Sequence, residues 1–149
     1  MEWEKGSQNL GRIISKKRFV DLVEKYLGIP FHNVGDNYGF SEGTSSYNSR
    51  FFREYKGKEI NDFIHFRSEN VRIVVLEPET LTPIYEPGRI GFLKVISPFG
   101  ISSYPGLSLL TPDLVEIVDV ENNDILSFRV IGRAKKSEIK GCGVKFGKD

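Results

Sequence analysis

The chain has 149 residues, of which 39% are hydrophobic and 28% are charged, and its formal net charge at pH 7 is +1. This length supports one domain with a buried core, and this composition is not that of a disordered chain. A net charge near zero gives no global electrostatic reason for binding nucleic acid. No apolar run approaches the ~20 residues that a membrane span requires. We therefore expect a single cytoplasmic domain over residues 1–149, with neither a membrane span nor a nucleic-acid partner.

The first predicted element is a helix over residues 15–27. Ser15 is a suitable N-cap, and apolar residues follow it at helical spacing. Gly28 ends the pattern and Pro30 follows it, as is usual beyond the C-terminus of a helix. A short strand-like piece, residues 31–34, comes next.

The remainder of the chain, from Asp62 onward, has the texture of β-structure. Runs of β-branched and aromatic residues alternate with turn-forming clusters rich in Pro, Gly, Asn and Asp. A helix followed by strands favours an α+β, β-rich fold. His65 is expected to be a structural histidine in a strand, and five aromatic residues nearby are expected to contribute to the core (Phe51, Phe52, Tyr55, Phe63 and Phe66). The expected strands are Val71–Leu76, Ile90–Ile96, Leu114–Val120 and Ile125–Ile131.

A loop rich in glycine and hydroxyl residues spans positions 38–46. Its glycines, including Gly39, permit a close approach to the backbone, and hydroxyls such as that of Ser41 can donate to phosphate oxygens. Glu42 is a candidate ligand for a Mg²⁺ ion that bridges phosphates, and Tyr38 is placed to stack on a base. The loop lacks the Gly-Lys-Ser/Thr ending of a P-loop, so an ordinary polar loop is the alternative.

Two charged residues stand at the ends of expected strands. Asp113 precedes one of them, where a carboxylate can accept hydrogen bonds from ribose hydroxyls or can simply cap a turn. Arg133 follows Gly132 at the end of another, and its planar donors suit phosphate or ribose oxygens. The alternative for Arg133 is a solvated basic edge. His32 and His65 have no partners at metal-ligand spacing, so a zinc site is not expected.

The only cysteine, Cys142, lies between two glycines near the C-terminus. From Arg129 to Lys148 there are seven basic residues and one acidic residue, Glu138. A positive surrounding favours the thiolate, which is the nucleophilic form of cysteine. The alternative is a cysteine that only packs, which is the common fate of a free thiol.

Three of these motifs occur in the order found in adenylate-forming ligases, the superfamily of acyl-CoA synthetases and luciferases. Residues 38–42 resemble its Tyr-Gly-x-Thr-Glu motif, residues 111–113 resemble its Thr-Gly-Asp motif, and residues 132–135 resemble its Gly-Arg-x-Asp hinge motif. Within the superfamily, residues 132–143 are similar to the acyl-protein synthetases of bacterial luminescence and their LuxE-like relatives. The resemblance runs from about Arg12 to Lys145.

This resemblance implies ATP and Mg²⁺ as cofactors and a fatty acid as the substrate. It implies that the acid is activated as an acyl-adenylate and then transferred to Cys142 as a thioester. The resemblance assigns a role to each motif residue. Tyr38, in its loop with Gly39, would contact adenine, Ser41 would contact the α-phosphate, and Glu42 would bind Mg²⁺. Asp113 would contact the ribose hydroxyls, Arg133 would contact the ribose or phosphate, and Lys135 would occupy the hinge position. Three positions depart from the family pattern, because Ser41 replaces Thr, Pro112 replaces Gly, and Lys135 replaces an acid.

The resemblance covers only part of such an enzyme, since no phosphate loop and no acyl pocket precede the helix. It implies the terminal helix–strand unit of a large α/β adenylating domain joined to a small distorted β-barrel, which the first three expected strands would build. We expect the chain to be incompetent alone and to need an N-terminal half, with an acyl reductase or a second copy as further possible partners. An aryl-CoA ligase of the phenylacetate-CoA ligase type, with coenzyme A as the acceptor, and a non-catalytic nucleotide-binding or assembly module remain alternatives.

Overall fold

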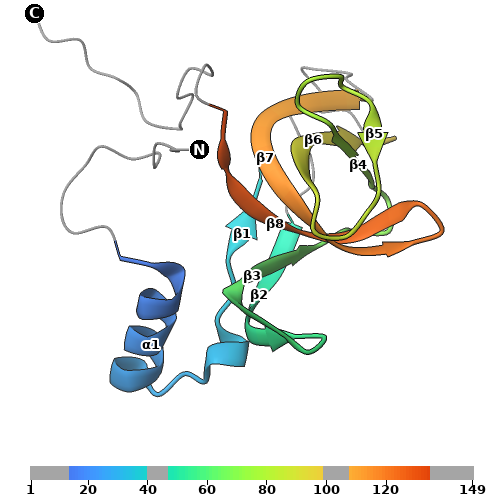
Figure 1. Ribbon diagram of the computed structural model, residues 1–149. Helices are drawn as coiled ribbons and strands as arrows, with labels where there is room; N and C mark the ends of the chain where they lie inside the picture. Colours follow the sequence, from blue (N-terminus) through green and yellow to red (C-terminus); the bar gives the residue numbers. More distant parts are fainter. Residues whose placement is uncertain (1–13, 40–46, 99–107, 135–149) are drawn as a thin grey trace, which may run out of the picture.

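The computed structural model describes residues 14–39, 47–98 and 108–134. One α-helix stands beside a strongly curled antiparallel sheet (Figure 1). No described helix is long and apolar enough to cross a membrane. The elements are α1 (Lys16–Leu27), the 3₁₀ helix η1 (Phe31–Asn33), β1 (Asn37–Tyr38), β2 (Tyr47–Tyr55), β3 (Lys58–Phe66), β4 (Arg72–Leu76), β5 (Pro83–Ile84), β6 (Ile90–Ile96), β7 (Ser108–Glu121) and β8 (Asp124–Arg133).

The helix α1 forms where the sequence predicts it. The Ser15 side chain accepts a hydrogen bond from the backbone N–H of Arg18, which satisfies one of the free donors of the first turn. At the other end Gly28 adopts a left-handed conformation with φ 67°, and its N–H donates to the Glu24 carbonyl at 3.1 Å. Both predicted ends of the helix are confirmed.

The prediction of a strand over residues 31–34 is wrong, because Phe31–Asn33 form the 3₁₀ helix η1. Pro30 begins this turn with φ −58°, a value that its ring imposes. The Pro30 carbonyl accepts a hydrogen bond from the N–H of Asn33 at 2.9 Å, which closes the turn. Only Val34 behaves as expected of a strand, since its carbonyl accepts a bond from Phe51 of β2 at 3.2 Å.

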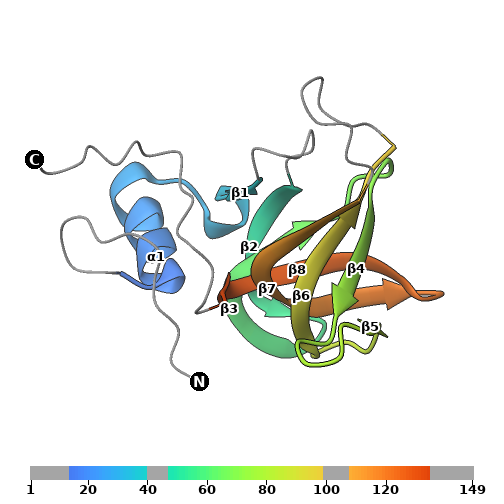
Figure 2. The ribbon, with the colours of Figure 1, turned by 90° about the horizontal axis from the view of Figure 1, so that it is seen from above.

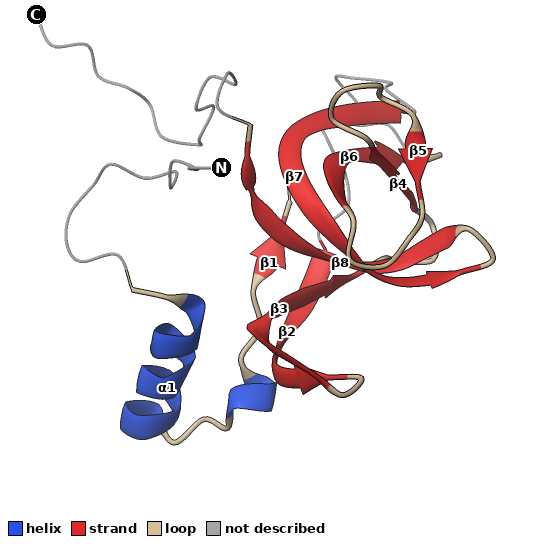
Figure 3. Cartoon of the chain, in the orientation of Figure 1, coloured by secondary structure: helices blue, strands red, loops and turns tan. Residues whose placement is uncertain are grey.

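The eight strands form one sheet in the order β1-β2-β3-β8-β7-β6-β4-β5. Every neighbouring pair is antiparallel. Bulges in the β2–β3, β6–β7 and β7–β8 pairs let the long strands bend, so the sheet curls on itself (Figures 2 and 3). The two ends of the order, β1 and β5, do not pair with each other, so the expected β-barrel is corrected to a curled, open sheet.

The predicted strands of the second half are confirmed as β4, β6, β7 and β8, but two of them are longer than expected. Strand β7 begins at Ser108, so Asp113 lies within a strand and not in front of one. Strand β8 continues to Arg133. The hairpin of β2 and β3 was not predicted; its turn residues Lys56 and Gly57 both have positive φ, as a tight hairpin turn requires.

Two groups of buried residues make the core. The larger fills the inside of the curled sheet and includes Ile73, Leu93 and Ile117. The smaller lies under α1, where Val20 packs with Val34 and two aromatic residues of the β2–β3 hairpin. Of the five aromatic residues expected in the core, Phe51 and Phe63 are buried, Phe52 and Tyr55 are half-buried, and Phe66 is exposed.

Candidate functional site

Three residues from separate predicted motifs meet at one carboxylate. The register of β7 and β8 places Asp113 opposite Arg133, and the Arg133 Nε donates to Asp113 Oδ1 at 2.8 Å. The short strand β1 brings in Tyr38, whose hydroxyl donates to the other oxygen, Oδ2, at 2.6 Å. Asp113 is buried, with 8% of its surface exposed. A cation and a phenol therefore hold the carboxylate from its two oxygens.

The backbone around Asp113 is held by its neighbour Thr111. The Thr111 hydroxyl donates to the Leu93 carbonyl of β6 at 3.0 Å and accepts a bond from the Asp113 N–H at 3.3 Å. Between them Pro112 has no N–H to place, and its carbonyl accepts a bond from Ala134 at 3.0 Å. Sequence reasoning named this Thr-Pro-Asp motif but missed the role of Thr111. The available signal was a hydroxyl residue placed two positions before the acid.

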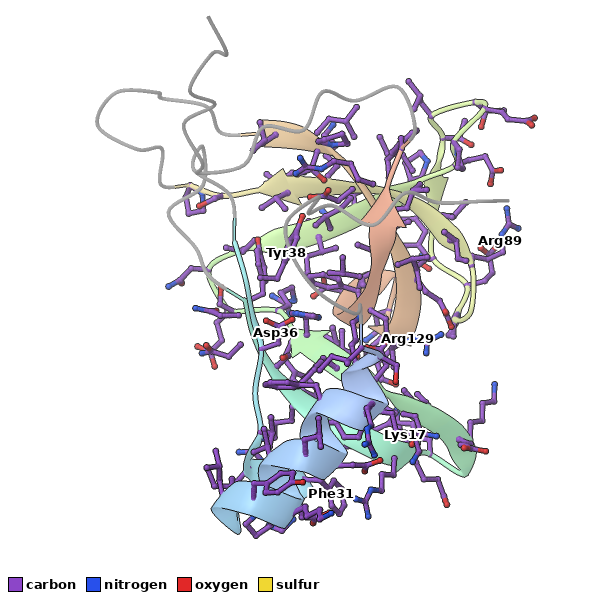
Figure 4. All side chains as sticks on the ribbon, turned by 90° about the vertical axis from the view of Figure 1, so that its left-hand side faces the viewer. Lys17, Phe31, Asp36, Tyr38, Arg89 and Arg129 are labelled. Carbon is purple, nitrogen blue, oxygen red and sulfur yellow. The ribbon has the colours of Figure 1, made fainter. Side chains whose placement is uncertain are left out.

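The ring of Tyr38 lies in a cluster of aromatic side chains. We call Tyr38, Tyr47, His65 and Phe128 the aromatic cluster. The Tyr38 ring meets His65 and Phe128 edge to face, with centroids 5.8 and 5.9 Å away, and it meets Tyr47 at a tilt at 6.0 Å. Burial, and then the hydrogen bond to Asp113, raise the pKa of Tyr38 well above its ordinary value. Figure 4 shows Tyr38 beside the strands of the sheet, away from Phe31 at the helical end of the molecule.

His65 is a strand histidine, as predicted. It lies in β3, is 1% exposed, and stacks on Phe128 with the two rings 19° apart. Neither ring nitrogen has a hydrogen-bond partner among the described residues. Burial lowers the pKa of His65 below its ordinary value, because the charged form is poorly solvated there. No pattern in the sequence indicated that His65 and Phe128 would lie beside Tyr38.

The remaining predicted site residues are placed only in part. Gly39 follows β1, and a Cβ atom added to it would meet no atom of the described residues within 4 Å, so crowding by that part of the chain does not require a glycine. Ser41, Glu42, Lys135 and Cys142 lie outside the described residues. Among the residues that are described, no group of three or more His, Cys, Asp or Glu side chains is arranged to hold a metal ion.

The positive charge of the basic segment from Arg129 to Lys148 is partly compensated by acidic residues of the sheet. Two of its seven basic residues lie in the described part of the chain, and both are paired with acids. Arg129 pairs with Glu116, and Arg133 pairs with Asp113. Their charge is therefore partly compensated, and it contributes less to any stabilisation of a thiolate than the sequence alone suggests.

Other charged residues join elements of the scaffold. Lys16 at the start of α1 contacts Asp62 of β3 at 2.6 Å, and Arg53 of β2 contacts Glu24 of α1 at 2.7 Å. Asp119 of β7 is bound at the tip of the β2–β3 hairpin; burial raises its pKa, but hydrogen bonds from Lys56 and Tyr55 lower it more, and the net pKa is lowered. These pairs link α1 and β7 to the β2–β3 hairpin, which carries Tyr47 and His65 of the aromatic cluster.

One cleft lies apart from this carboxylate. It has a volume of 680 Å³, and none of Tyr38, Asp113 and Arg133 lines it. Its walls come from the segment that leads into β4 and from the ends of β6 and β8, and within it Arg67 is already paired with Asp124 at 2.8 Å. The lining residues are Arg67, Glu69, Asn70, Val71, Arg72, Ile96, Ser97, Pro98 and Asp124.

The family model for acyl-protein synthetase, LuxE, matches residues 5–149 of the chain. The chain belongs to the LuxE acyl-protein synthetase family. The family expected from the three motifs is thereby confirmed. No curated protein and no solved structure matches the chain.

Each oxygen of Asp113 accepts one bond from a described side chain, and a carboxylate oxygen can accept two. The guanidinium of Arg133 lies beside this carboxylate. Chemically, the arrangement can accept hydrogen bonds from hydroxyl groups and places a positive charge near them.

Proposed function

We propose that this LuxE-family chain is the C-terminal part of an ATP-dependent fatty acid–protein ligase. The observation that carries the proposal is the meeting of Tyr38, Asp113 and Arg133, which come from three motifs and are separated by 75 and 20 residues along the chain. Residues so far apart in sequence share one carboxylate at the place where the family resemblance expects a ribose. The family match supports an acyl-protein synthetase over an aryl-CoA ligase.

The proposed reaction has two steps. In the first, a fatty-acid carboxylate oxygen bonds to the α-phosphorus of ATP and the bond to pyrophosphate breaks, which leaves an acyl-adenylate. In the second, the Cys142 sulfur, after losing its proton to solvent, bonds to the acyl carbon, and AMP departs with the electrons of the broken C–O bond. ATP supplies the leaving group that makes the acyl carbon reactive enough for a thiolate.

The residues of this chain have distinct parts in the proposal. Asp113 accepts the two ribose hydroxyls, and Arg133 holds the orientation of Asp113 while placing positive charge near the phosphate. The other assignments follow the family resemblance and fall on residues outside the described part: Ser41 on the α-phosphate, Glu42 on Mg²⁺, Lys135 at the hinge, and Cys142 as the acyl acceptor.

The proposal includes a partner. The helix α1 and the curled sheet would form the end of a larger adenylating domain, with the phosphate loop and acyl pocket in an N-terminal half. Exposed apolar side chains on and beside α1 support a covered surface there: Phe19, Tyr26, Leu27 and Ile29 are each at least 40% exposed. An acyl reductase would then receive the acyl group from Cys142.

The experiment that tests the proposal starts from a synthetic acyl-adenylate, because that donor bypasses the activation step. The intact mass of the purified chain is measured after incubation, beside Cys142→Ala and Cys142→Ser variants. We expect a single acyl adduct on the wild type that neutral hydroxylamine removes, and no such adduct on either variant. Equal labelling of wild type and Cys142→Ala, or no labelling at all, would contradict the role of Cys142 as acceptor.

A further inference from the structure

The position of Tyr38 bears on how the proposed ribose site is built. The hydroxyl of Tyr38 lies 2.6 Å from Asp113 Oδ2, and its ring contacts three rings of the aromatic cluster. These ring contacts hold the side chain in place, so the hydroxyl stays beside the carboxylate. The family resemblance assigns only the ring of Tyr38, to adenine, and it gives the hydroxyl no role.

We propose that Tyr38 is a positioning residue whose hydroxyl fixes the carboxylate of Asp113 for the ribose hydroxyls. The identity of the ligand rests on the function proposed above. The role of Tyr38 rests on the contacts of its hydroxyl and ring.

The two bonds to Asp113 use different oxygens. Arg133 holds Oδ1 and Tyr38 holds Oδ2, so rotation of the carboxylate about its last bond would break both hydrogen bonds. A vicinal diol needs both oxygens at a fixed tilt, because its two O–H donors are fixed relative to each other by the ribose ring. Preorganisation of this kind increases affinity by removing the cost of ordering the acceptor when the ligand binds.

The aromatic cluster explains why Tyr38 can do this from a strand of two residues. Among the described residues, strand β1 pairs with β2 at Asn37–Asn48 and Tyr38–Tyr47. The buried rings of His65 and Phe128 add a wall that comes from β3 and β8. Because burial, and then the bond to Asp113, raise the pKa of the Tyr38 phenol, the hydroxyl is protonated and acts as a donor at neutral pH.

The test compares two nucleotides, AMP and 2′,3′-dideoxy-AMP, whose bases and phosphates are the same. Their dissociation constants are measured by isothermal titration calorimetry with the wild type, with Tyr38→Phe, and with Tyr55→Phe. The Tyr38→Phe variant keeps the ring and removes only the hydroxyl. The Tyr55 hydroxyl also donates to an aspartate, Asp119, at 2.5 Å, so its variant is a matched control for losing a tyrosine hydroxyl that is bonded to a carboxylate.

We expect the wild type and Tyr55→Phe to prefer AMP to the dideoxy nucleotide. In Tyr38→Phe the affinity for AMP should fall by about tenfold, as for the loss of a hydrogen bond to a charged group, and the affinity for dideoxy-AMP should not change. If Tyr38→Phe weakens both nucleotides equally, or weakens neither, Tyr38 does not act through Asp113 and the inference is wrong.

A second measurement needs no nucleotide. In wild-type protein with ¹³C-labelled tyrosine, the Tyr38 ring carbon that bears the hydroxyl is followed by NMR as the pH rises, with and without Asp113→Asn. We expect Tyr38 to begin to ionise at a lower pH in the variant, because the acceptor loses its negative charge. An unchanged titration refutes the bond. If the bond is present but the wild type does not distinguish AMP from dideoxy-AMP, the ribose assignment in the proposed function fails and the inference fails with it for that separate reason.

Discussion

The substitution Thr111→Val tests how the backbone of Asp113 is held. Valine has nearly the shape of threonine, so the substitution chiefly replaces one hydroxyl with a methyl group. Thr111 is 5% exposed; its hydroxyl donates to the Leu93 carbonyl at 3.0 Å, accepts from the Asp113 N–H at 3.3 Å, and also interacts with the Tyr38 hydroxyl. The variant loses these bonds where water cannot easily replace them.

The magnitude follows from opposing contributions. A buried polar group left without its partner costs about 1–3 kcal/mol, and the longer bond from Asp113 belongs at the low end of that range. The methyl group that replaces the hydroxyl recovers up to about 0.8 kcal/mol through burial of apolar surface. We therefore expect the free energy of unfolding to fall by roughly 2 kcal/mol, or about 4–8 °C in the midpoint of thermal unfolding for a chain of this size.

The assay is urea and thermal unfolding followed by far-UV circular dichroism. The matched control is Thr82→Val, because among the described residues the Thr82 hydroxyl bonds to the exposed hydroxyl of Thr80, at 2.8 Å. Substitutions at exposed positions of this kind usually change the free energy of unfolding by less than about 0.5 kcal/mol. If Thr111→Val proves as stable as wild type, the hydroxyl does not anchor the Asp113 backbone and the reasoning fails.

Two further predictions concern the sheet around the site. Gly91→Ala should destabilise the protein by about 1–3 kcal/mol, because its new Cβ would lie 2.3 Å from the Leu76 carbonyl oxygen. This cost exceeds the gain of up to about 1 kcal/mol that comes from restricting the unfolded chain. Urea unfolding measures the free energy of unfolding of Gly91→Ala beside that of Gly39→Ala, a control at an open position. Equal stability of the two variants would contradict the prediction. The folded-state pKa of His65 is lowered, so the unfolded chain takes up its proton first and the stability of the wild type should decline as the pH falls below about 6.5. His65→Phe keeps the stacked ring and should remove this part of the decline, whereas a variant of the exposed His32 should not; identical pH profiles for all three proteins would show that His65 does not titrate on unfolding.

Local signals in the sequence are strong where a structure is specified by nearby residues. The helix α1 was predictable at both ends because the Ser15 cap and the left-handed Gly28 act within one turn. Strands β4, β6, β7 and β8 were predictable because β-branched residues favour extended backbone. The turn η1 was missed because Pro30 and the few residues after it also suit an extended backbone, and the backbone hydrogen bonds from Asn33 and Val34 are what distinguish the two.

The β2–β3 hairpin shows where a sequence pattern is too weak. Its strands carry charged residues such as Arg50, Arg53 and Glu59, which lower the apparent β-propensity of the segment. The buried pair of Phe51 and Phe63, whose rings meet edge to face at 5.3 Å, is what the hairpin places under α1. Cross-strand packing of this kind depends on a partner strand that a single segment does not reveal.

The sequence by itself determined the family, the helix, four of the strands, and the identity of the charged residues in the motifs, because these depend on local residue types and their order. Only the tertiary structure decided that Tyr38, Asp113 and Arg133 share one carboxylate and that the Tyr38 ring lies against His65 and Phe128. The register of β7 against β8 and the curl of the sheet set these contacts. Both are properties of the whole sheet, since a shift of one residue in a strand would turn every side chain of that strand to the opposite face.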